Sequence, residues 1–434
     1  MMRNSAVIAA TSASLMLLAG SACDNGNDKD KVDSATDGSP TDAASIDAPP
    51  GSGEAEELWT FEEEFGIPTH VALSQNGGRA FMVWDTNEAK LVLLDTATGK
   101  EIWALDIMDR IPLDDKGDRV VPGVSQLGIS NDGSFLTACI GSTILGFSAD
   151  KPEPIWEAPL EGFIIMRGSM ARASGAIALL IVDATSGDSS VVVYDKTGKK
   201  DWEFGPVANE APGVISVSVS DDGSVAVGTY NNNLFVIEKD KDGKGKSRFN
   251  DHVEGAYLQA LLSGDGKVVF EGVGAREVRL LRWNETTYEE VWKHQHTCSA
   301  TMCFTTTMAI SNDGAFAATG VGDNTVGHIF VFGDASGDPV YDSGNIGGFV
   351  SSIALSHNGR VVSAGSWGNK AHSVSDFFLV DRAKAAKYYD LSTAGSTSMV
   401  SLSGDGRFAI ASFRSMYATE MSYGGTIRVF STGQ

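Results

Sequence analysis

The sequence predicts an all-β fold made of eight repeated four-stranded units, and three observations support this prediction. A short turn motif, in which Ser is followed by any residue, Asp or Asn and then Gly, recurs along the chain at intervals of 42 to 56 residues. Apolar residues alternate on both sides of each turn with the period of two that is typical of β-strands. A repeat of about 47 residues suits a four-stranded unit rather than a helical one.

The turn motif is clearest at Ser403-Gly-Asp-Gly406, which lies between apolar runs that begin at Met399 and end at Ser412. With a degenerate third copy, Arg172-Ala-Ser-Gly175, the motif closes at Gly77, Gly133, Gly175, Gly223, Gly266, Gly314, Gly359 and Gly406. Each copy joins two predicted strands, and two further strands follow before the next copy. Repeated units of this length and composition form the blades of a β-propeller, so we predict an eight-bladed β-propeller.

The two ends of the chain are predicted to pair with each other. The last unit stops after the strand at 425–431, where a fourth strand is expected to begin. Glu57-Leu-Trp-Thr-Phe61 has the tryptophan and the alternation of the other fourth strands. Pairing these segments closes the ring and removes exposed sheet edges. We therefore expect residues 57–434 to form one propeller that is closed by its N-terminal and C-terminal strands.

One stretch of the first unit resembles a known family. Asp95-Thr-Ala-Thr-Gly-Lys-Glu-Ile-Trp103 is similar to the repeat of quinoprotein-like (PQQ-like) propellers, and Asp195-Lys-Thr-Gly-Lys-Lys-Asp-Trp202 is a weaker copy. WD-repeat-like propellers are the alternative, although their Gly-His and Trp-Asp signature is missing. The resemblance implies that a quinone-binding member needs two adjacent cysteines, which this chain lacks. We therefore expect no cofactor.

The first 56 residues are predicted to lie outside the propeller. Residues 1–22 have the basic start and short apolar run of a signal peptide. Leu17-Leu-Ala-Gly-Ser-Ala-Cys23 resembles the bacterial lipoprotein box, which implies lipidation of Cys23. The polar, acidic stretch that follows predicts a flexible tether over residues 23–56. The expected location is the bacterial cell envelope, lipid-anchored at a periplasmic or outer surface; plain secretion after cleavage at Ser21 or Ala22 is the alternative.

The charge of the chain limits its partners. The formal net charge is −23 at pH 7, and no basic stripe interrupts the acidic surface. A phosphate backbone is repelled by such a surface, so nucleic acid is excluded as a partner. The same charge favours basic surfaces on partner proteins.

Cysteine and histidine residues give the only candidate cross-link and metal site. Cys139 lies in an apolar run and is expected to be buried. Cys298 and Cys303 are predicted to form a loop disulfide, because an exported protein meets oxidising conditions. His294 and His296 share one face of a predicted strand with Cys298, which makes them weak candidates for zinc or copper ligands.

The first strand of each blade is expected to surround the propeller axis. Four residues before each turn serine, or its counterpart, the chain has His70, Gln126, Gly168, Ser216, Gln259, Thr307, Ser352 and Met399. This ring contains one histidine and no acid, whereas calcium or zinc needs converging carboxylates or imidazoles. We therefore predict no metal and no catalytic centre at the axis.

The function predicted from these features is a membrane-tethered, non-enzymatic propeller that presents its loops to a protein or polymer partner in the cell envelope. The alternative is an envelope enzyme, either a hydrolase or lyase that uses loop residues or a degenerate quinoprotein. No spacing in the sequence identifies a catalytic residue, because a propeller brings distant loops together.

Overall fold

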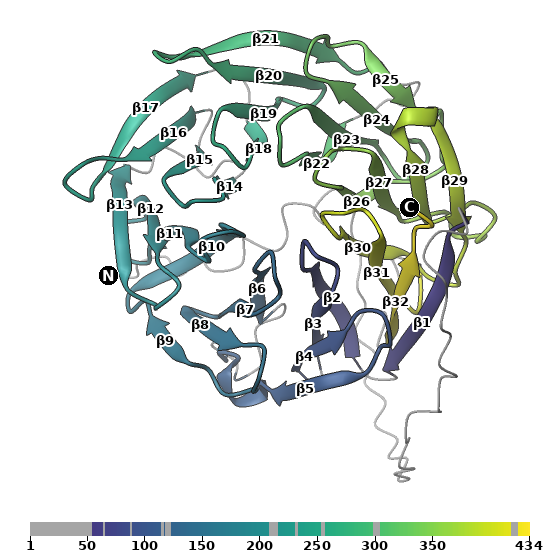
Figure 1. Ribbon diagram of the computed structural model, residues 1–434, viewed down its shortest axis with the longest axis horizontal. Helices are drawn as coiled ribbons and strands as arrows, with labels where there is room; N and C mark the ends of the chain where they lie inside the picture. Colours follow the sequence, from purple (N-terminus) through teal and green to yellow (C-terminus); the bar gives the residue numbers. More distant parts are fainter. Residues whose placement is uncertain are drawn as a thin grey trace, which may run out of the picture. The chain divides into compact units, whose positions relative to one another are not determined.

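The computed structural model describes residues 54–63, 66–86, 89–113, 117, 123–207, 216–230, 233–252, 257–297, 304–417 and 424–434. These residues form eight four-stranded antiparallel sheets arranged in a ring (Figure 1). The predicted eight-bladed β-propeller is therefore confirmed. The predicted signal peptide, the tether up to residue 53, Cys23, Cys298 and Cys303 lie outside the described residues.

Each of the first seven blades follows the chain from its inner strand to its outer strand. Blade one contains β2 (Gly66–Leu73), β3 (Arg79–Thr86), β4 (Lys90–Asp95) and β5 (Glu101–Asp106), and the 3-10 helix η1 (Met108–Arg110) follows. Blade two contains β6 (Val124–Ile129), β7 (Phe135–Ile140), β8 (Thr143–Ser148) and β9 (Trp156–Pro159). Blade three contains β10 (Phe163–Met170), β11 (Ile177–Asp183), β12 (Ser189–Tyr194) and β13 (Lys200–Val207). Blade four contains β14 (Ser216–Val219), β15 (Val225–Tyr230), β16 (Asn233–Lys239) and β17 (Gly245–His252).

The second half of the ring repeats this order. Blade five contains β18 (Tyr257–Leu262), β19 (Val268–Val273), β20 (Glu277–Trp283) and β21 (Tyr288–Gln295). Blade six contains β22 (Phe304–Ile310), β23 (Phe316–Gly322), β24 (Gly327–Gly333) and β25 (Pro339–Asp342). Blade seven contains β26 (Val350–Leu355), β27 (Val361–Ser366), β28 (Phe377–Asp381), the 3-10 helix η2 (Arg382–Lys384) and β29 (Ala386–Leu391). Blade eight combines β30 (Thr397–Leu402), β31 (Phe408–Arg414) and β32 (Gly425–Ser431) with β1 (Glu56–Glu63).

The N-terminal strand completes the last blade, as predicted. β1 pairs antiparallel with β32, with Trp59 opposite Val429 and Phe61 opposite Ile427. Arg428 Nη1 lies 3.0 Å from Glu57 Oε2 across this pairing. Because the two strands come from opposite ends of the chain, the ring is closed only when both ends are folded.

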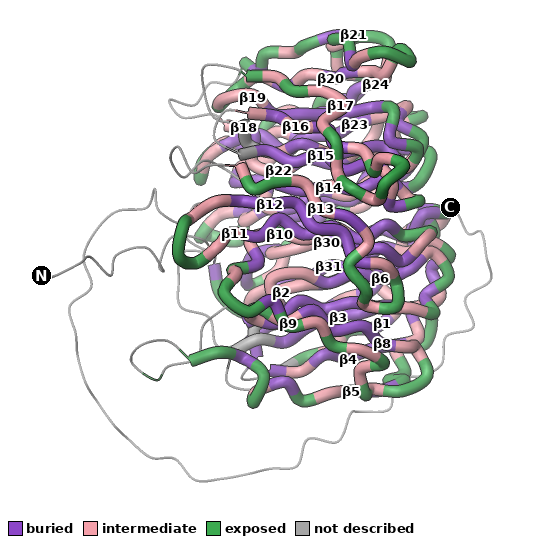
Figure 2. Tube along the Cα trace, turned by 90° about the vertical axis from the view of Figure 1, so that its left-hand side faces the viewer, coloured by how far each residue is buried: buried purple, intermediate pink, exposed green. Residues whose placement is uncertain are grey.

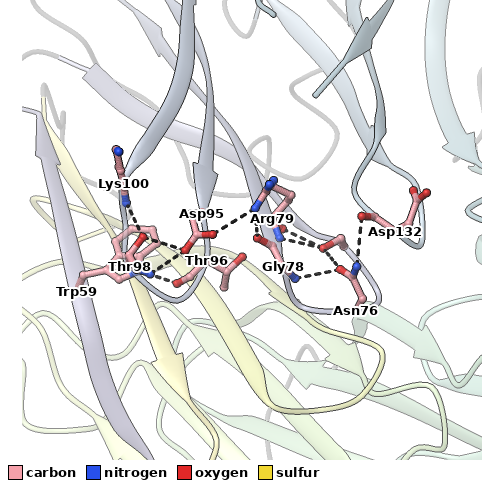
Figure 3. Close-up of polar contacts among 10 residues, drawn as sticks. Trp59, Asn76, Gly78, Arg79, Asp95, Thr96, Thr98, Lys100 and Asp132 are labelled. Carbon is pink, nitrogen blue, oxygen red and sulfur yellow. Dashed lines mark hydrogen bonds and ion pairs between the residues drawn. The ribbon is translucent and has the colours of Figure 1, made fainter. Parts of the chain in front are cut away.

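The turn motif works through its serine hydroxyl and its Asp or Asn side chain. In blade one, the Ser74 hydroxyl donates to Asn76 Oδ1 at 2.8 Å and accepts from the Arg79 N–H at 3.0 Å (Figure 3). Asn76 Oδ1 also accepts from the Gly78 N–H at 2.9 Å. The serine is buried and the backbone of Gly77 has a φ of +70°. This arrangement explains why Ser, Asp or Asn, and Gly recur at fixed spacing.

The turns of successive blades are also joined to one another. The Asn76 N–H donates to Asn131 O at 3.0 Å, and the Asp221 N–H donates to Gly264 O at 2.8 Å. The Asp405 N–H donates to Gln75 O at 3.2 Å, which links the eighth blade to the first. These backbone bonds hold the inner ends of the blades together on one face of the ring.

The tryptophan of the quinoprotein-like repeat packs against the next blade. Trp59 Nε1 donates to Thr96 O at 2.7 Å, and its ring lies on the turn that contains Thr98 (Figure 3). A Cβ atom on Gly99 of that turn would lie 2.8 Å from Trp59. Trp156 makes the same contact with blade three, where Nε1 donates to Lys196 O at 2.8 Å. The Thr-Gly-Lys turn and the tryptophan therefore belong to one interblade contact.

This contact gives a prediction for Gly198→Ala. The new Cβ would lie 2.6 Å from the Trp156 ring, at a backbone φ of +80°. We expect the variant to lose about 2–3 kcal/mol of unfolding free energy, measured by urea denaturation, because steric overlap adds to backbone strain. Gly162→Ala is the matched control, because Gly162 has the same φ of +80° with no atom within 4 Å. Equal losses in the two variants would contradict the packing role of the tryptophan.

The core lies between neighbouring sheets. One cluster joins Phe81 of blade one to Phe147 of blade two, and another joins Phe377 of blade seven to Phe430 of blade eight. Buried residues therefore run through the stacked strands, while the turns are mostly exposed (Figure 2). Cys139 on β7 is fully buried, as predicted. Among the described residues, no helix is long and apolar enough to cross a membrane.

Candidate functional site

The inner strands carry a β-bulge just before the predicted axial position. In β2, Pro68 pairs with Trp84 and His70 pairs with Val83, so Thr69 is left without a partner in the ladder. The same register shift occurs in β6, β10, β18, β22, β26 and β30. A bulge re-aims the side chains that follow it. The residue after the bulge is therefore equivalent from blade to blade.

The third blade corrects the alignment made from sequence. The Gly175 N–H donates to Ala171 O, four residues earlier, whereas the Gly77 N–H donates to Ser74 O, three residues earlier. The Ala171 N–H donates to Ala176 O as the Ser74 N–H donates to Arg79 O, so Ala171 takes the place of the turn serine. The turn keeps its length, and its glycine lies one position later than in blade one. Arg167, which pairs with Leu180, is then equivalent to His70. The sequence alignment placed Gly168 there because it counted back from the glycine.

Two of the predicted axial residues join neighbouring blades. The Ser216 hydroxyl accepts from the Ala260 N–H of blade five at 2.9 Å. The Ser352 hydroxyl accepts from the Val400 N–H of blade eight at 3.1 Å. Both serines are buried, so their polar atoms serve the contact between inner strands. This position therefore has a structural role in these two blades.

The other aligned residues remain partly accessible. Gln126, Gln259 and Thr307 are half-buried, and Gln126 Nε2 donates to Leu127 O at 2.8 Å. Arg167 is exposed, and its Nη1 donates to Met166 O at 2.9 Å. These side chains offer hydrogen-bond donors and one positive charge, but no carboxylate that acts as a general base.

His70 and Arg167 influence each other although they come from blades one and three. Burial lowers the pKa of His70 to about 4, and the positive charge of Arg167 adds to this shift. The Nδ1 atom of His70 is buried without a hydrogen-bond partner. Although the Arg167 side chain keeps contact with solvent, the protein around its guanidinium partly desolvates it and lowers its pKa from the usual value. At neutral pH this part of the ring therefore holds one guanidinium and one neutral imidazole.

The electrostatic coupling gives a prediction for Arg167→Gln. We expect the pKa of His70, measured by NMR titration, to rise from about 4 toward its usual value while remaining below it, because burial is the larger cause of the shift. Arg172→Gln, a charge change on the turn of the same blade, is the control and leaves the pKa of His70 unchanged. If His70 titrates identically in wild type and Arg167→Gln, Arg167 does not face it.

The weak metal candidates, His294 and His296, lie between blades five and six with a third histidine that the sequence did not connect to them. The His294 and His296 ring centroids are 5.1 Å apart, and His296 stacks on Phe330 at 5.1 Å. His328 stacks on the same Phe330 at 5.5 Å. The sequence feature that could have pointed to His328 is its alternation with Phe330 on β24, 32 residues after His296.

His296 is the buried member of this histidine cluster. His296 is 2% exposed, and neither of its ring nitrogens has a hydrogen-bond partner. Burial lowers the pKa of His296 to about 3, with smaller contributions from His294 and His328. Within the described part of the chain, no group of three or more His, Cys, Asp or Glu residues has the geometry to hold a metal ion.

Comparisons with known proteins agree with the architecture. A family model described as outer membrane protein assembly factor BamB matches residues 187–331, which span blades three to six. No curated protein matches the chain. The β-propeller domain of Cps50 (Swd1) from Myceliophteria thermophila covers 71% of this chain and 96% of its own, with 13% identity and a TM-score of 0.50.

A second solved structure gives the same result. The C-terminal WD40 domain of Sif2 is 14% identical, with a TM-score of 0.51, and the match covers 72% of this chain and 81% of that one. At this level of identity the structural likeness establishes the fold alone. The chain is thus an eight-bladed β-propeller, with quinoprotein-like repeats over its middle third and WD40 domains among its structural neighbours.

Proposed function

We propose that this protein is a non-enzymatic β-propeller that is tethered to a membrane of the bacterial cell envelope and presents its loops to a protein partner. One observation carries the proposal: the similarity of residues 187–331 to the family model of an outer membrane assembly factor. The lipoprotein-like segment that ends at Cys23 supports an envelope location. A surface polymer of the envelope is the other kind of partner that a presented loop surface suits.

The chemistry of the inner strands supports a binding role. The aligned positions provide Ser216 and Ser352 for interblade hydrogen bonds and Arg167 for an anionic or acceptor group. Backbone bonds between turns and the tryptophan contacts join neighbouring blades, as blade one to blade two and blade eight to blade one. Rigid scaffolds that expose loops are well suited to recognition, since the loops change while the core is kept.

Capture of partners from native membranes tests the proposal. Cells that carry the full chain with a C-terminal affinity tag are cross-linked, and the captured proteins are identified by mass spectrometry. We expect a small, reproducible set of envelope proteins. A tagged, unrelated lipoprotein is the control for nonspecific capture. An enzymatic turnover found in a broad hydrolase and lyase screen, with no captured partner, would contradict the proposal.

The membrane tether is tested separately through Cys23. In a Cys23→Ala variant, we expect the protein to move from the membrane fraction to the soluble fraction, because the proposed lipid site is removed. Cys139→Ala is the control, since this thiol is buried in the propeller. Retention of Cys23→Ala in the membrane fraction would refute lipidation at this residue and leave the partner proposal standing.

A further inference from the structure

The interfaces between blades five and six and between blades six and seven are built from equivalent positions but are filled differently. On the outer strand of blade five, Trp292 pairs with Leu280. On the outer strand of blade six, Tyr341 pairs with Val331 in the same way. Two and four residues after Trp292, the interface between blades five and six has His294 and His296. Two and four residues after Tyr341, the interface between blades six and seven has Ser343 and Asn345. The second interface is therefore lined by smaller side chains at both positions.

The facing strand shows the same difference. Phe332 of β24 is opposite Pro339, and the equivalent Val380 of β28 is opposite Lys387. By the same register His328 corresponds to Asp376. Four positions that carry rings between blades five and six thus carry smaller side chains between blades six and seven. The phenyl ring of Phe330 has its counterpart in Phe378.

A cavity of about 440 Å³ lies between blades six and seven, and three of the four changed positions, Ser343, Asn345 and Val380, line it. Its apolar wall residues come from both blades: Ile329, Tyr341, Ile346, Val374, Phe378 and Val380. A volume of this size is within the range of small-ligand pockets. The wall residues belong to β24, β25, β28 and the segments next to these strands, which are neighbours in the ring (Figure 1).

Polar groups of both blades also line the cavity: Ser343 and Asn345 of blade six, and Ser375 and Lys387 of blade seven. Lys387 Nζ lies 3.0 Å from Asp390 Oδ2 and 5.6 Å from the centroid of the Phe378 ring. The side-chain oxygen of Asn345 accepts from the Gly347 N–H at 2.8 Å, so its nitrogen points away from that bond. The border therefore supplies a cation and an amide donor beside an aromatic floor.

We propose that this cavity, defined by the six wall residues above, receives an aromatic side chain from the protein partner of the propeller. The inference rests on the proposed function and names where the partner docks. The neighbouring interface shows the fit, because two imidazole rings stack on Phe330 there at 5.1 and 5.5 Å. Aromatic residues are also the usual anchors of protein interfaces, and a nearby ammonium group attracts an aromatic face.

Binding of 5-fluoroindole to the full chain, followed by ¹⁹F NMR, tests the cavity directly. We expect saturable binding to the wild-type protein in the millimolar range. Val380→Phe and Ser343→His place the side chains of the neighbouring interface into the cavity. Each is expected to weaken binding about tenfold or more. The melting temperature of Val380→Phe is expected to stay the same or rise because an empty space is filled, whereas Ser343→His also loses the hydrogen bond that the Ser343 hydroxyl accepts from the Ile329 N–H at 2.9 Å.

The control is Ser336→His, the same substitution on an exposed turn of blade six. It is expected to leave the dissociation constant of 5-fluoroindole within about twofold of wild type. Ser343→Ala, which enlarges the cavity, keeps or strengthens binding and serves if a filling variant fails to fold. No saturable binding to wild type, or equal binding to the wild type and both filling variants, overturns the inference.

Partner capture separates this inference from the function it rests on. Envelope proteins captured by the wild type but lost with Val380→Phe support docking at the cavity when the variant also loses 5-fluoroindole. Equal capture by the wild type and Val380→Phe contradicts docking at the cavity and leaves the proposed function intact. Absence of a partner for the wild type contradicts both.

Discussion

A chain that begins at Gly66, and so lacks β1, is expected to lose at least about 5 kcal/mol of unfolding free energy. Without β1 the last blade has three strands, and the ladder partners of β32 on that side are lost. Trp59, which is 8% exposed and donates to Thr96 O, is removed as well. Deleting a buried tryptophan side chain alone typically costs 3–5 kcal/mol. Urea denaturation followed by circular dichroism measures the loss.

Two further chains isolate the cause. A chain that begins at Glu54 lacks the predicted signal peptide and all but the last three residues of the predicted tether but keeps β1, and it is expected to be as stable as the longer protein. Trp59→Ala in that chain is expected to lose about 3–5 kcal/mol. If removing β1 leaves the stability unchanged, pairing between the chain ends does not stabilise the ring.

Replacement of Glu271 by Gln is expected to remove a large pH dependence of stability. Glu271 on β19 is fully buried, and Arg279 Nη2 lies 2.5 Å from its Oε1 atom. Burial raises the pKa of Glu271 to about 7 in spite of this contact, since Asp251 and Glu290 lie near the same guanidinium. Neither carboxylate oxygen of Glu271 accepts a well-directed hydrogen bond.

The sign follows from proton binding. Between its ordinary pKa of about 4.5 and pH 7, Glu271 keeps a proton in the folded protein that the unfolded chain has released. Folding is therefore destabilised as pH rises through this window, by about 3 kcal/mol in total. In Glu271→Gln this contribution is absent, so the stability difference from wild type is expected to grow in favour of the variant from pH 4.5 to pH 8.

Urea denaturation at several pH values checks this expectation. Glu290→Gln is the matched control, because Glu290 is 41% exposed and lies 3.8 Å from Arg279 Nη1. The control is expected to keep most of the pH dependence. Parallel stability curves for the wild type and Glu271→Gln would show that folding does not raise the pKa of Glu271.

Much of the fold was predictable because its signals are local. The serine, Asp or Asn, and glycine of each turn bond to one another within six residues, as Ser74 does with Asn76 and Arg79. Such a motif is visible in one sequence, and its repetition counts the blades. The pairing of β1 with β32 was also predictable, because one end of the chain lacked the strand that the other end supplied.

The candidate site was less predictable because it depends on register. In the turn of blade three the glycine lies one position later than in the other turns, so Arg167, rather than Gly168, is at the aligned position. The bulges that set this position leave no mark on the alternation of apolar residues. His328 joined His296 through the packing of blade six on blade five, which no spacing along the chain encodes.

The sequence by itself determined the all-β class, the number of blades, the turn chemistry and the closure of the ring. Only the tertiary structure decided which side chains meet between blades: the Arg279 and Glu271 pair, the histidines on Phe330, and the cavity above Phe378. The physical reason is the distance along the chain between the residues that are in contact. Turns form from neighbouring residues, whereas each interface is filled by side chains from two blades, and its fit depends on their combined volume.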